Sequence, residues 1–127
     1  MVAQVQESNV ASVDAALQDL LRYAEVFGAV AINREGLVIG VAGVECNQAE
    51  MVGALGASLL GVAERTSMGM GAGLVEHVTV TTREGMVHVH RGREVAILIF
   101  TSRVDSVVAA GLTMSALRVI SEVVAAG

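Results

Sequence analysis

The chain has 127 residues, the length of one ordinary domain, and 54% of them are hydrophobic, which is enough for a sizeable core. Its formal net charge is −5 and its aromatic content is 2%, so it lacks the basic surface and the stacking side chains of a nucleic-acid-binding protein. No stretch approaches the ~20 apolar residues that span a bilayer, so no membrane insertion is expected.

Two features favour a cytoplasmic location. The first 21 residues contain neither Lys nor Arg, so the basic start of a secretory signal is missing. Cys46 is the only cysteine, which excludes an intrachain disulfide.

The mean hydropathy of +0.64 is high for a soluble monomer and favours self-association.

The N-terminal part of the chain predicts a helix followed by a hairpin. Residues 1–8 are expected to fray, and residues 9–127 to form one domain, which opens with a helix to about residue 24. The apolar runs 27–32 and 37–42 then predict two strands joined by a tight turn that ends in glycine.

Residues 47–68 predict a central helix with two different sides. Val52, Leu55, Leu59 and Val62 fall on one side and are expected to pack against a sheet. The other side carries small residues, with Glu50, Glu64 and Arg65 at its two ends, and interior glycines cost a helix roughly 1 kcal/mol each relative to alanine. This bare side therefore predicts close backbone approach by the same helix of a second copy. Its members are Ala49, Gly53, Ala54, Ala57, Ser58 and Gly61.

The C-terminal half predicts three strands and a helix. Residues 76–82 and 86–90 form a second hairpin around an Arg-Glu-Gly turn. Residues 94–100 are continuously apolar, which places this strand in the middle of the sheet. Helical spacing then continues over residues 103–124.

The element order is thus αββαβββα, an α/β sandwich. Five strands linked mostly by tight turns make an antiparallel sheet, and amphipathic helices must cover both of its faces. The first and last helices can share one face, which leaves the central helix alone on the other.

This element order, the GAVAINREGLVIG hairpin and the small-residue central helix resemble the roadblock/dynein light chain family, and within it the MglB-like bacterial members. The resemblance covers about residues 10–124. It implies a profilin-like fold that pairs as a homodimer through the central helix and the third strand, so that one sheet continues across two subunits.

The resemblance also implies a function, which is to bind and regulate a Ras-like small GTPase without being an enzyme itself. Docking alone and stimulation of GTP hydrolysis both stay open. The small-residue side of the central helix is the predicted dimer interface. The polar residues expected to bind the partner are Glu50, Ser58, Glu64 and Arg65.

Catalytic and metal sites have little support. His88 and His90 share one face of a strand, and His77 lies on the neighbouring strand, so three imidazoles could approach a zinc ion. No Asp or Cys is spaced as a further ligand, and neutral histidines are the commoner occurrence. No metal, cofactor or catalytic residue is therefore predicted.

Two alternatives remain open at this point. The same fold can pair with a different roadblock chain and act as a heteromeric scaffold that leaves nucleotide turnover unchanged. A profilin-like domain can also sense a ligand, although the sequence shows no polar pocket signature.

Overall fold

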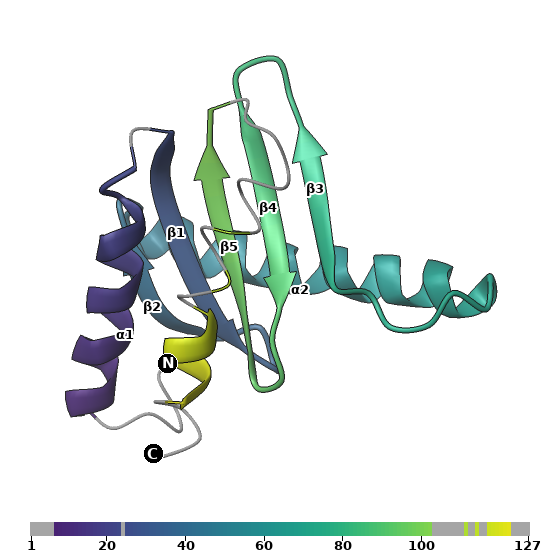
Figure 1. Cartoon of the computed structure of the whole chain (residues 1–127), viewed down its shortest axis with the longest axis horizontal. Helices are drawn as coiled ribbons and strands as arrows, with labels where there is room; N and C mark the ends of the chain where they lie inside the picture. The colour runs from purple at the N-terminus through teal and green to yellow at the C-terminus, as the bar shows by residue number, and fades with distance from the viewer. Residues whose placement is uncertain (1–6, 24, 103–110, 112–113, 115–116, 123–127) are drawn as a thin grey trace.

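A five-stranded antiparallel sheet with helices on both faces organises the chain (Figure 1). The computed structural model describes residues 7–23, 25–102, 111, 114 and 117–122. Most of the helix predicted over 103–124 lies outside these residues, although 117–122 are helical. The elements are α1 (Glu7–Leu20), β1 (Val26–Asn33), β2 (Val38–Ala42), α2 (Cys46–Gly69), β3 (His77–Thr81), β4 (Met86–Arg91) and β5 (Val95–Thr101).

The strands lie in the order β2-β1-β5-β4-β3, and neighbours run antiparallel. β5 occupies the centre, and its residues 95–99 are all buried. The mid-sheet position predicted from its continuous apolar run is therefore confirmed. β2 and β3 are the two edge strands.

Each face of the sheet has its own apolar core. On one face, Val13 and Leu17 of α1 pack with Leu117, Ile120 and the alternate side chains of β1 and β5. α1 begins at Glu7, so it starts inside the stretch expected to fray. α2 covers the opposite face alone, as predicted (Figure 1).

The predicted orientation of α2 is only partly correct. Val52 and Leu59 pack against the core, as predicted, but Leu55 and Val62 face outward, and the helix turns small residues toward its own sheet instead. Ala49 is fully buried, and Gly53, Gly56 and Leu60 are buried with it. These four positions follow a spacing of four, three and four residues, which is one face of a helix. A Cβ on Gly56 would lie 2.6 Å from Leu98 Cδ2, so the missing side chain permits close contact between α2 and β5.

This packing predicts opposite effects for two glycines of the same helix. Gly56→Ala is expected to lower the free energy of unfolding by about 1–2 kcal/mol, because crowding against buried Leu98 exceeds the gain in helix propensity. Gly61→Ala is the matched control, since its nearest neighbour would lie 3.7 Å away. The free energy of unfolding of the Gly61→Ala variant should rise by about 1 kcal/mol. Urea unfolding at one protein concentration measures both, and equal stabilisation by the two changes would contradict the packing.

Candidate functional site

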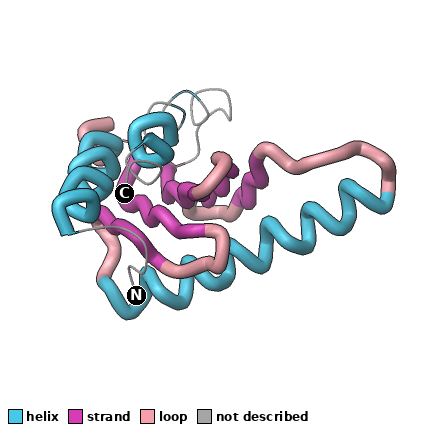
Figure 2. The backbone as a smooth tube through the Cα atoms, turned by 90° about the horizontal axis from the view of Figure 1, so that it is seen from below, coloured by secondary structure: helices cyan, strands magenta, loops and turns pink. Residues whose placement is uncertain are grey.

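α2 is longer than the sheet it covers. Its 24 residues extend about 36 Å, whereas five strands span about 19 Å between the outer two. The C-terminal end of the helix therefore projects beyond β3, and the following loop returns from there to the sheet (Figures 1 and 2).

The outward side of α2 carries large apolar side chains. Met51, Leu55 and Val62 are exposed by 60%, 61% and 53% of their surface. At about 100° per residue they lie on one side of the helix, between the exposed Ala54 and Ser58 on one flank and the half-buried Leu59 on the other. We call Met51, Leu55 and Val62 the apolar stripe. Large apolar side chains grouped in this way mark interaction surfaces.

The apolar surface continues past both ends of the stripe. Near the N-terminal end of α2, Met51 borders a hollow of about 370 Å³ that is also lined by Phe27 and Phe100. Phe27 is 60% exposed. At the projecting end, Met68, Met70 and Leu74 are exposed as well.

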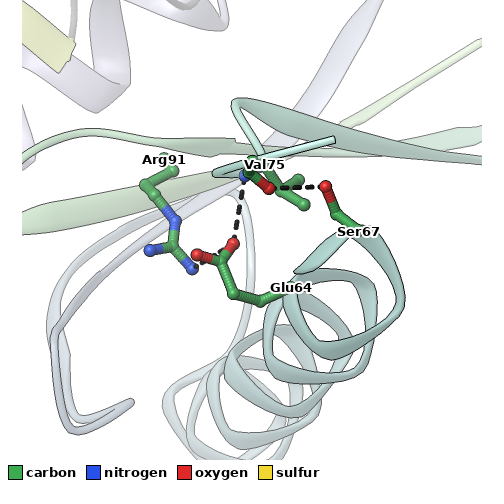
Figure 3. A network of polar contacts seen from close by, with 5 residues as sticks. Glu64, Ser67, Val75 and Arg91 are labelled. Carbon is green, nitrogen blue, oxygen red and sulfur yellow. Dashed lines mark hydrogen bonds and ion pairs between the residues drawn. The ribbon is translucent and has the colours of Figure 1, made fainter. Parts of the chain in front are cut away.

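The projecting end is held in a fixed position by polar contacts (Figure 3). The Glu64 carboxylate accepts a 3.0 Å hydrogen bond from the Val75 backbone N–H, and it lies 3.6 Å from the Arg91 guanidinium. The Ser67 hydroxyl donates to the Gly73 carbonyl oxygen. Helix, returning loop and β4 are thereby tied together, so the exposed apolar residues sit on an ordered support.

β3 lies directly beside this projection and is an edge strand. It pairs with β4, and His77, Val80 and Thr81 are exposed along it. Its other edge therefore offers backbone groups to a further strand.

The predicted interface residues divide into three groups. Ala49 and Gly53 are buried under the helix against its own sheet and cannot meet a partner. Ala54 and Ser58 are exposed next to the apolar stripe. Ala57 and Gly61 are half-buried on the flank opposite Leu59, where they line a second pocket.

The predicted partner-binding residues also differ in their positions. Glu50, Ser58 and Arg65 are exposed on α2 and available to a partner. Glu64 is only partly accessible, because it forms the contacts with Val75 and Arg91 described above.

The three histidines gather on the α1 side of the sheet. His77 lies opposite His90, and their rings stack with centroids 5.0 Å apart. His88 is fully buried, with Nδ1 3.1 Å from the Thr79 hydroxyl oxygen and Nε2 3.1 Å from that of Thr101. Burial, and then the charge of His77, lowers the pKa of His88.

His90 is the most strongly perturbed of them. It is 5% exposed, and its Nε2 has no hydrogen-bond partner in the described part of the chain. Burial is the main cause that lowers its pKa to about 4, followed by the charges of His77 and His88. At neutral pH, His90 is therefore uncharged.

The described residues contain no group of three His, Cys, Asp or Glu side chains placed to bind one metal ion. Within the same residues, every helix is too short or too polar to cross a bilayer.

Comparison with known proteins identifies the family. The model of the roadblock/LC7 domain matches residues 12–102, well over half of the chain. The chain belongs to the roadblock/LC7 family. A search of curated protein sequences returns no match.

Solved structures share the fold of this roadblock domain at low sequence identity. The roadblock/LC7 domain from Streptomyces avermitilis is 20% identical and has a TM-score of 0.80, with 86% of this chain and 94% of that chain covered. The gliding protein MglB from Thermus thermophilus is 11% identical, with a TM-score of 0.84 and coverage of 100% and 99%. MglB from Myxococcus xanthus is 15% identical, with a TM-score of 0.79 and coverage of 94% and 92%.

Sequence reasoning missed that Leu55 and Val62 face away from the sheet of this roadblock domain. The signal was the position of Leu60, which shares the spacing of Ala49, Gly53 and Gly56. Because Leu60 makes the small-residue side apolar as well, either of the two sides of this helix could pack against the sheet. In this chain, Leu60 packs against the sheet together with the small residues, whereas Leu55 and Val62 face outward.

Proposed function

We propose that this roadblock domain is a noncatalytic homodimer that serves as a binding platform for a Ras-like small GTPase and stimulates its GTP hydrolysis. Membership of the roadblock/LC7 family and the similarity to MglB structures support this proposal. The observation that carries it is the apolar stripe on a helix that projects beyond its own sheet.

A second copy of α2 is the surface that fits the stripe best. In an antiparallel pair related by a two-fold axis, each projecting end lies over the partner's sheet. Each stripe residue then occurs twice in the dimer interface, once from each subunit. Burying one Leu or Val side chain stabilises the pair by about 1.5–3 kcal/mol. Ala54 and Ser58, both exposed beside the stripe, permit close approach at its border.

Pairing of the two β3 strands would place the two α2 helices antiparallel and side by side on one face of the joined sheet, so that the helices touch along one flank of the stripe. Each β3 has a free edge beside the projecting end of α2, so two of them can join antiparallel into a ten-stranded sheet. The exposed valine and threonine side chains of β3 suit such an edge.

The pair of helices then forms the platform for the GTPase. Glu50, Ser58 and Arg65 are exposed polar residues on it, and they are proposed to contact the partner together with Phe27 near the N-terminal end of the stripe. Glu64 is proposed to act by holding the projecting end of α2 in place.

GTP hydrolysis by candidate Ras-like GTPases tests the function directly. Adding the domain is expected to raise the single-turnover rate of its cognate GTPase at least about tenfold. Arg65→Glu should weaken this effect, because it reverses an exposed charge on the platform, whereas Arg83→Glu in the β3–β4 turn should not. Binding with an unchanged rate would instead assign the domain to scaffolding, and failure of GTP-loaded and GDP-loaded forms to bind would overturn the proposal.

A further inference from the structure

A pocket rich in arginine lies on the flank of α2 opposite Leu59. Its cavity measures about 340 Å³, within the range of small-molecule sites. The apolar residues around it are Ile32 and Leu60, which are buried, and Ala57, which is half-buried, and Arg34, Arg91 and Arg93 also line it. We call these six residues the arginine pocket.

The concentration of positive charge is unusual for this chain. Its net charge is −5 and it has eight cationic residues, all of them arginine. Three of these line the pocket, and the Arg65 guanidinium would lie 3.7 Å from a Cβ on Gly61, another lining residue. Against these four cations stand three nearby carboxylates, Glu94 in the lining, Glu64 paired with Arg91, and Glu35 beside Arg34 in the same turn. Positive charge therefore predominates around the pocket.

Two rigid turns place the arginines. Asn33 pairs with Val95 across β1 and β5, which brings the β1–β2 and β4–β5 turns to the same end of the sheet. The Asn33 side-chain oxygen accepts hydrogen bonds of 3.0 Å from the N–H groups of Glu35 and Leu37. In the other turn, the Gly92 N–H donates to the Val95 carbonyl oxygen at 2.7 Å.

Much of this charge is unpaired. Arg91 contacts Glu64, but Arg34 and Arg93 form no ion pair with any described residue. Guanidinium groups offer planar pairs of donors that match the oxygens of phosphate, and a phosphomonoester carries close to two negative charges at neutral pH. The unpaired guanidinium groups of Arg34 and Arg93 therefore suit a phosphate group.

We propose that the arginine pocket binds a small phosphomonoester, with its phosphate between the arginines and its apolar body against Ala57. The pocket and the apolar stripe lie on different sides of α2, so both can be occupied together. The site is distinct from the apolar stripe and shares only Arg65, at its border, with the proposed GTPase platform. It supplies the polar pocket that the sequence alone does not reveal.

Calorimetric titration of the full chain with phenyl phosphate tests this site. The expected dissociation constant is about 1 mM or below, and inorganic phosphate should bind about tenfold more weakly because it lacks the apolar body. In nuclear magnetic resonance spectra, the amides that shift should include Arg34, Gly61 and Gly92.

The variant Arg34→Gln/Arg93→Gln is expected to weaken phenyl phosphate binding at least about tenfold without changing the fold, because both side chains are exposed. Arg83→Gln is the matched control, since Arg83 lies in a turn at the opposite end of the sheet. Equal binding by the double variant, an equal loss in the control, or amide shifts away from the pocket would each overturn the proposal. Stimulation of a GTPase is measured separately and does not depend on these results.

Discussion

Replacing Leu55 with glutamate is expected to convert the proposed homodimer into a monomer. Leu55 is 61% exposed in the single chain and lies in the apolar stripe, so the two-fold axis places two copies in one interface. Losing two leucines from the interface weakens the free energy of dimer association by about 4 kcal/mol. The new carboxylates would also lose hydration if they were buried there. The dimer dissociation constant should rise about a thousandfold. Sedimentation equilibrium over a range of concentrations measures it.

Leu37→Glu provides the matched control for this change. Leu37 is 40% exposed, but it lies next to β2 at the opposite edge of the sheet from β3. The same chemical change there should leave the dimer intact. Loss of the dimer in both variants, or in neither, would remove the apolar stripe from the interface.

Lowering the pH from 7 to 4 is expected to destabilise the fold through His90. Its pKa is about 4 in the folded chain, against about 6.5 when unfolded. Between these values, protons bind the unfolded state preferentially, so stability is fully present above the upper pKa and is lost as the pH falls. Protonation linked to His90 lowers the free energy of unfolding by about 2 kcal/mol at pH 5, and this decrease levels off near about 3 kcal/mol below pH 4.

Urea unfolding at several pH values measures this dependence. His90→Gln removes the titrating ring and should flatten the curve between pH 7 and 4, whereas His77→Gln changes an exposed ring and should have a smaller effect. The lowered pKa of His88 acts in the same direction and leaves part of the slope in His90→Gln. An unchanged slope in that variant would show that His90 is not the dominant group.

The strands were predictable because their signals are local. The continuous apolar run of β5 fixed its central position, and the Asn33 to Gly36 turn fixed the first hairpin, with Gly36 at a φ of +86°. The alternation of β4 placed His88 and His90 on one face, as the structure has them.

The orientation of α2 could not be predicted in the same way. A glycine side permits close approach by any neighbour, and Gly53 and Gly56 give the same pattern whether that neighbour is the chain's own sheet or a second subunit. Hydrophobicity does not decide between the two, since Leu55 and Leu60 lie on opposite sides. The interface is therefore proposed on the exposed larger apolar residues. Ala54 and Ser58, which the sequence also predicts there, lie at its border.

The arginine pocket depends on contacts between distant parts of the chain. Arg34 and Arg93 are close only because Asn33 pairs with Val95, far along the sequence. No local pattern in either turn indicates that the other turn lies beside it.

The mass of the unmodified chain in solution tests the central claim most directly. Light scattering at micromolar concentration should give twice the chain mass of 13.1 kDa, about 26 kDa. A particle of 13.1 kDa that still stimulates a Ras-like GTPase would contradict a platform built from two projecting helices.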